Sequence, residues 1–161
     1  MLSPNDLAAA FARNVFIVKR QTDGLSHADS LIQLPFQGNP LNWVLGHVAV
    51  NRDDVLALLD EPPVMTADGK RYKRESDPLT GQEEDILPLE ELLARLDQSQ
   101  ERIAAALGRM SEADMARELT LSNDRKMTLG QRVFFYYFHE TYHVGQTELL
   151  RQLAGKHDKV I

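Results

Sequence analysis

Four stretches of the chain place hydrophobic residues three or four positions apart, the spacing that lines up one face of an α-helix. The first stretch follows Ser3 and Pro4, a capping residue and a proline that suit the start of a helix, and it ends before Gly24. Its hydrophobic positions are Leu7, Phe11, Val15 and Val18. We therefore predict a first long helix between Ser3 and Gly24.

A second long helix is predicted to begin at Pro40 and to end before Pro62. Its hydrophobic stripe consists of Leu41, Val44, Leu45, Val48, Leu56 and Leu59. The residues that follow, 62–86, are mostly polar and include a basic run at 70–74 and an acidic run at 82–85. Loops of this length are usually functional or mobile, so we expect a long connection after the second helix.

The third and fourth long helices are predicted in the second half of the chain. The third begins at Pro88, and its hydrophobic positions alternate steps of three and four, as is typical of helix bundles. These positions are Leu89, Leu93, Leu96, Ile103, Leu107 and Met110. Thr128 and Gln131 form a capping box for the last helix, which is predicted to run to about Leu153, before Gly155.

Two more capping pairs, Ser26 with Asp29 and Ser111 with Asp114, predict brief helices between the long ones. No convincing strand pattern is present. We therefore predict an all-α fold in which a single domain, residues 1–161, forms a four-helix bundle. A long connection joins the second and third long helices of this bundle.

The composition narrows the functional classes. Cysteine is absent, which excludes disulfides, thiolate metal ligands and a cysteine nucleophile. The formal net charge of −6 argues against a broad basic surface for nucleic acid. The first six residues lack the features of a signal peptide, and the apolar runs are too short to cross a bilayer. We expect a soluble cytoplasmic protein that binds neither nucleic acid nor membranes.

A histidine pair stands out on the last predicted helix. His139 and His143 are four residues apart, directly after the aromatic run 134–138. A helix places residues at this spacing on one face, about one turn apart. Two imidazoles arranged in this way can bind one metal ion. The pair alone is also compatible with two ordinary histidines of a helical core.

His47 is the candidate for a third ligand. It lies beside the hydrophobic stripe of the second long helix, on one line with Trp43 and Val50. Gly46 would allow another helix to approach closely and bring His47 to the other two histidines. Taken alone, His47 fits a hydrogen-bonded core residue better than a metal ligand. The three histidines together favour a metal site between two facing helices.

The residues from His139 to His143 also spell H-E-x-x-H, the signature of zinc proteases, in which the glutamate activates water. The extended metzincin motif needs a glycine and a third histidine where this chain has Gln146 and Leu149. No predicted strand could align a peptide, so a protease is disfavoured. Glu140 is the nearest candidate for a catalytic base. Its offset of about 100° from His139 on a helix is equally compatible with orienting a ligand or pairing elsewhere.

The segment 42–47, Asn-Trp-Val-Leu-Gly-His, and the segment 139–146, His-Glu-Thr-Tyr-His-Val-Gly-Gln, together resemble the DinB-like (DinB/YfiT-like) metalloenzyme superfamily. The resemblance implies a four-helix bundle in which His47, His139 and His143 hold a divalent metal ion, zinc or nickel, or iron. It also implies a homodimer, and relatives that include transferases and isomerases using low-molecular-weight thiols.

Two functional hypotheses follow from these patterns. The first is a metal-dependent enzyme, a thiol-dependent transferase or a hydrolase, that acts on a small molecule. The alternative is a non-enzymatic, metal-stabilised or metal-sensing helical dimer, and an ordinary bundle without metal is a third reading. The basic run 70–74 would admit an anionic cosubstrate in the first case, and is more simply a solvated loop.

Overall fold

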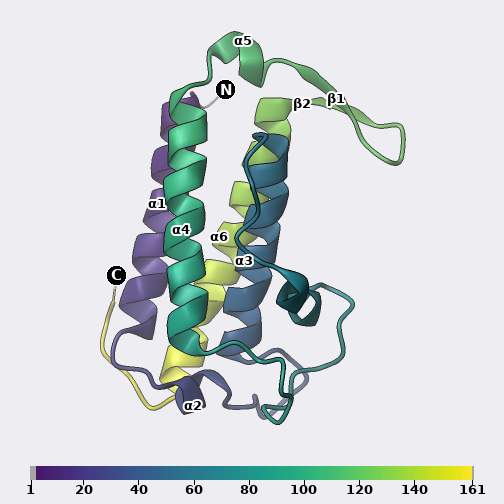
Figure 1. The fold of residues 1–161 in the computed structure, drawn as a ribbon. Coiled ribbons are helices and arrows are strands. Elements are labelled where there is room, and N and C mark those ends of the chain that lie inside the picture. Colours follow the sequence, from purple (N-terminus) through teal and green to yellow (C-terminus); the bar gives the residue numbers. More distant parts are fainter. Residues whose placement is uncertain (1–2, 161) are drawn as a thin grey trace.

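The computed structural model describes residues 3–160, and helices dominate it (Figure 1). The helices are α1 (Pro4–Thr22), α2 (His27–Ser30), α3 (Leu41–Leu58), the 3₁₀ helix η1 (Ala67–Tyr72), α4 (Leu89–Gly108), α5 (Glu112–Met115) and α6 (Leu129–Leu153). The strands are β1 (Glu118–Thr120) and β2 (Lys126–Thr128). The all-α prediction is confirmed, with four long helices at the predicted places.

The helix boundaries follow the capping residues of the sequence. The Ser3 hydroxyl accepts the backbone N–H of Asp6 at the start of α1, and the Thr128 hydroxyl accepts that of Gln131 at the start of α6. The reciprocal side-chain bonds are also present, so each pair forms a complete capping box. Capping satisfies backbone donors that the first turn of a helix leaves free.

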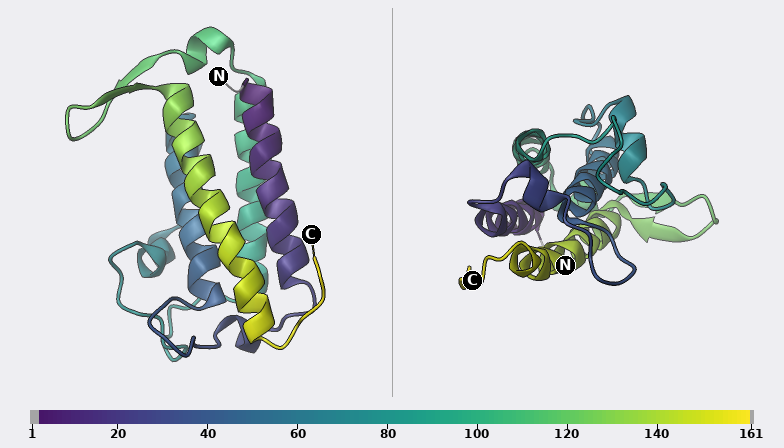
Figure 2. Two further views of the ribbon diagram at one scale, coloured as in Figure 1. Left: turned by 180° about the vertical axis from the view of Figure 1, so that it is seen from behind. Right: turned by 90° about the horizontal axis from the view of Figure 1, so that it is seen from below.

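The four long helices form a bundle in which α1 packs against α4 and α6, and α3 packs against the same two helices. Figure 1 shows that α3 and α4 run in the same direction, and the end-on view of Figure 2 shows the four helices around a common core. Two consecutive parallel helices need a connection that returns along the bundle. This requirement explains the long connection, residues 59–88, which was predicted from its polar sequence.

Within residues 3–160 the structure also contains a pair of short strands, for which the sequence offers no convincing pattern. An antiparallel hairpin precedes α6, with Leu119 opposite Met127, and it projects from one end of the bundle (Figure 1). Each strand is only three residues long, so no alternating pattern could reveal it. The backbone of Asp124 is left-handed, with φ of 60°, which suits the tight turn between the strands.

No helix within residues 3–160 combines the length and the apolar character that crossing a membrane requires. The most enclosed helix is α3, in which every residue from 41 to 49 is buried. It is contacted by α4, α6 and η1. The long connection therefore forms part of the wall around α3, and His47 lies behind it.

Candidate metal centre

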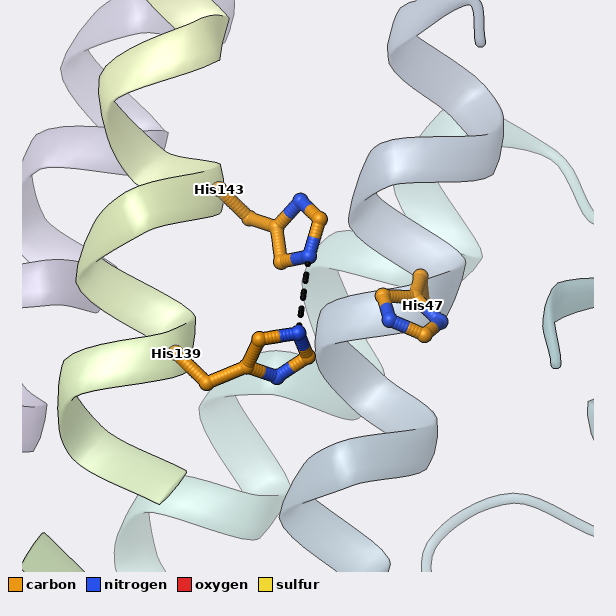
Figure 3. A group of neighbouring side chains, drawn as sticks. All are labelled: His47, His139 and His143. Atoms are coloured by element: carbon orange, nitrogen blue, oxygen red, sulfur yellow. Dashed lines mark hydrogen bonds between the residues drawn. The ribbon is translucent and has the colours of Figure 1, made fainter. Parts of the chain in front are cut away.

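Three histidines from two facing helices meet in the bundle (Figure 3). His139 and His143 project from consecutive turns of α6, and His47 projects toward them from α3. One ring nitrogen of each residue lies within 4.8 Å of the corresponding nitrogens of the other two. His47 is buried and the other two are half-buried. These are the three residues that the sequence brought forward as metal ligands.

Hydrogen bonds determine which nitrogen of two of these rings carries the proton. His47 Nδ1 lies 2.8 Å from the backbone carbonyl oxygen of Tyr72. His143 Nδ1 lies 2.8 Å from the side-chain Oε1 of Gln146. Because a carbonyl oxygen only accepts, both Nδ1 atoms must donate their protons. The Nε2 atom of each neutral ring then keeps its lone pair for a metal ion.

The geometry of the pair on α6 fits a metal ion. The Nε2 atoms of His139 and His143 are 3.1 Å apart. Two nitrogens bound to one tetrahedral zinc ion at 2.0–2.1 Å would be separated by about 3.3 Å. The pair is therefore close to the spacing that a shared metal needs, and a ring nitrogen of His47 lies within 4.8 Å of both. The three imidazoles of this group can hold a metal ion.

The surroundings favour neutral imidazoles. Burial lowers the pKa of His47 from 6.5 to about 4. Burial also lowers the pKa of His139 and His143, and the positive charge of Arg74 adds to this effect on His139. Metal ligation requires a deprotonated ring nitrogen. The lowered pKa values keep all three imidazoles neutral at neutral pH, the form that binds a metal ion.

Gly46 brings the long connection into contact with His47. A Cβ atom at residue 46 would lie only 2.1 Å from Cδ1 of Tyr72, so no other amino acid fits without displacing that ring. We expected Gly46 to let another helix of the bundle approach. The structure shows instead that Gly46 makes room for the ring of Tyr72, the last residue of η1. The close approach places the Tyr72 carbonyl where it accepts the proton of His47 Nδ1.

Asn42 holds Tyr72 in this position. The Tyr72 hydroxyl donates to Oδ1 of Asn42 at 3.1 Å and accepts the backbone N–H of Leu87 at 2.8 Å. The Asn42 side-chain amide also donates to the Leu87 carbonyl at 2.9 Å. The asparagine five positions before His47 thus acts on the histidine through Tyr72, and it fastens the middle and the end of the connection to α3.

Trp43 completes the surroundings of His47. Its ring stacks on the imidazole with centroids 4.6 Å apart and planes at 11°. Its indole N–H donates to Ser76 Oγ at 3.1 Å. Tyr72 and Ser76 therefore anchor the connection on both sides of the exposed Arg74, whose charge is felt at His47 and His139.

Comparison with known proteins agrees with this architecture. The family model for the DinB superfamily matches residues 18–147, which include all three histidines. The chain belongs to the DinB superfamily. A comparison with curated proteins finds no match.

Within this DinB-superfamily site, Glu140 has other partners. Its side chain is 3% exposed, and its two carboxylate oxygens accept hydrogen bonds from Nε and Nη2 of Arg52 at 2.8 and 2.7 Å. Arg52 is fully buried and also donates to the Phe11 carbonyl and to Ser99. The geometry gives no support to Glu140 as a base at the histidines, and matches the reading in which it pairs elsewhere.

Sequence reasoning missed Tyr72 and Arg52. Tyr72 lies in a connection without a regular pattern, and the only signal for it was a glycine beside a buried histidine. Arg52 was visible as a charged residue within an otherwise apolar helix. A fully buried arginine needs an acidic partner. In this DinB-superfamily fold, Glu140 on the facing helix supplies it.

Proposed function

We propose that the chain is a metal-dependent enzyme in which His47, His139 and His143 hold one divalent ion, with zinc or nickel preferred and iron a further candidate. The observation that carries this proposal is the donor set. Within residues 3–160 the group contains three imidazoles and no carboxylate or further side chain. Three protein ligands and an open position are typical of catalytic zinc sites, whereas structural zinc sites use four protein ligands.

When bound, a divalent ion lowers the pKa of a coordinated water or thiol and so supplies a nucleophile near neutral pH. The chain orients the imidazoles through the Tyr72 carbonyl and Gln146, and Trp43 shields His47. Because the chain has no cysteine, a reacting thiol would come from a low-molecular-weight cosubstrate. The proposed reaction is therefore a thiol-dependent transfer or a hydrolysis of a small molecule.

The position of Arg74 suggests that this cosubstrate carries an anionic group. The residue is exposed and lies between two anchored residues, Tyr72 and Ser76. An exposed guanidinium at the rim of a cation site recognises carboxylates and phosphates through paired hydrogen bonds. We assign to Arg74 the role that the sequence suggested for the whole basic run 70–74.

The competing proposal is a non-enzymatic dimer that senses or is stabilised by a metal ion. The dimer in this proposal draws on an aromatic surface on α6, formed by Phe134, Phe138 and Tyr142. These side chains are 45%, 63% and 63% exposed. Large exposed aromatic groups on one helix are typical of protein interfaces, so this surface supports a homodimer in either case. Sedimentation of the Phe138→Glu variant tests the dimer, because a charge at the centre of the interface should give a monomer.

Metal content and turnover separate these functions. Purified wild-type protein should contain about one metal ion per chain, and the His139→Ala variant should contain little. Metal-loaded protein should then be tested with a panel of thiols and electrophiles. Equal metal content in both proteins would reject the metal site. If the loaded protein turns nothing over and His47→Ala lowers only the thermal stability, the non-enzymatic function is the correct one.

A further inference from the structure

An apolar pocket of about 560 Å³ opens between the segment that leads into α3 and the last turns of α6. Its apolar wall is formed by Leu34, Phe36, Leu149, Leu150 and Leu153. Pockets of 300–1,000 Å³ with apolar walls and a few polar groups are the usual sites for small molecules. The volume suits a molecule of roughly drug size.

The polar groups of this pocket are uncharged. The polar residues that line it are Gln37, Asn39, Gln146 and Gln152, and no charged residue of the described chain, 3–160, joins them. A second pocket beside η1 differs, since its lining includes two aspartates and two lysines. Amides can donate and accept hydrogen bonds but do not offset a full charge. The pocket therefore fits a neutral, largely apolar group that carries a few hydrogen-bonding atoms.

Gln146 joins this pocket to the metal centre. Gln146 is one of the lining residues, and its Oε1 atom accepts the Nδ1 proton of His143 at 2.8 Å. His143 and Gln146 lie on consecutive turns of α6, so the pocket lies one helical turn from the histidine group, on the Nδ1 side of His143. A molecule in the pocket would therefore lie beside a residue that orients a metal ligand.

We propose that this pocket binds the neutral apolar part of the substrate, whose reactive head group reaches the three histidines. The proposal rests on the proposed function, because it needs a metal ion with an open position. It adds a substrate class: a molecule with a polar or anionic reactive end and an uncharged hydrocarbon body. The uncharged amides among the apolar side chains favour a small ligand over a purely apolar contact with a second copy of the chain.

Binding of straight-chain hydroxamic acids to the zinc-loaded protein tests the proposal, because the hydroxamate ligates the metal and the alkyl chain probes the pocket. Calorimetry should show that acetohydroxamate binds and that affinity rises about three- to fourfold for each added methylene until the pocket is filled. This rise in affinity with chain length should be lost in the Leu149→Trp and Leu153→Trp variants, because the larger side chains narrow the pocket from its rim. Both variants should still bind acetohydroxamate.

Phe16→Trp is the matched control, since it adds an indole at an exposed position of α1, away from the pocket. It should keep the full dependence on chain length. Failure of acetohydroxamate to bind would refute the open metal position and hence the proposed function. If acetohydroxamate binds but affinity does not rise with each methylene, the role of the pocket is refuted while the proposed function stands. The same holds if the rise in affinity persists in both tryptophan variants. The wild type could also show no gain in affinity per methylene while Leu149→Trp converts a dimer to a monomer. This result would assign the pocket to a subunit interface and would also overturn the proposal.

Discussion

The Nδ1 atom of His47 lies 2.8 Å from the carbonyl oxygen of Tyr72, and this contact joins the candidate metal ligand on α3 to the long connection. The contact exists because Gly46 leaves room for the tyrosine ring. The orientation of one metal ligand therefore depends on a residue 25 positions later in the chain. The connection is part of the site rather than a simple link between helices.

The Gly46→Ala substitution should disturb both folding and metal binding. The added Cβ would lie 2.1 Å from the Tyr72 ring, so Tyr72 must move and the His47 bond must lengthen. Overpacking of this kind costs about 1–3 kcal/mol of unfolding free energy. Urea unfolding and zinc titration measure the two effects.

Gly145→Ala is the control for that prediction. Gly145 lies within α6, and a Cβ atom added there would meet open space. Alanine stabilises a helix interior by about 0.5–1 kcal/mol relative to glycine. The control should therefore become slightly more stable and keep its zinc affinity. Equal behaviour of the two variants would contradict the role given to the contact between Gly46 and Tyr72.

Gln146 should tune the metal affinity through His143. Gln146→Leu removes the acceptor for the Nδ1 proton, and loss of such a partner lowers metal affinity by about 10- to 100-fold. Gln146→Glu keeps an acceptor at this position and should retain the affinity. Competition with a chromophoric chelator measures both constants. A leucine variant with wild-type affinity would show that His143 needs no orienting partner.

Glu140 should stabilise the fold rather than take part in catalysis. Glu140→Leu leaves the buried charge of Arg52 unpaired, which costs about 3–5 kcal/mol. The double variant with Arg52→Met removes both charges and should regain most of this loss. Urea unfolding of the single and double variants gives the comparison. If Glu140 were a catalytic base, the double variant would be stable and metal-loaded but inactive.

The sequence was sufficient to predict the parts of this molecule that depend on local patterns. Capping pairs and hydrophobic spacing located the long helices, and the spacing of His139 and His143 located half of the metal centre. The partners of Gly46 and Glu140 depend on how distant segments pack. Tyr72 reaches Gly46 from a connection with no regular pattern, and Arg52 meets Glu140 across two helices. Such contacts leave no periodic signal in the chain.

Acid should destabilise the metal-free protein between pH 6.5 and about pH 4, the unfolded and folded pKa values of His47. Burial also lowers the pKa of His139 and His143. In this window the unfolded chain binds protons that the folded chain does not, so the free energy of unfolding falls as the pH falls. Below the folded pKa values both states are protonated and the loss is complete.

We expect a total loss of about 1–3 kcal/mol, because one pKa unit corresponds to about 1.4 kcal/mol and partial solvent access reduces the full value. Urea unfolding at a series of pH values measures it. His47→Gln removes the most strongly shifted group and should flatten the profile above about pH 5.5, where carboxylates whose unfolded pKa values are 3.8 or 4.5 are ionised in both the folded and the unfolded state. An identical slope in the wild type and this variant would contradict the assignment, because the loss would then come from groups other than His47.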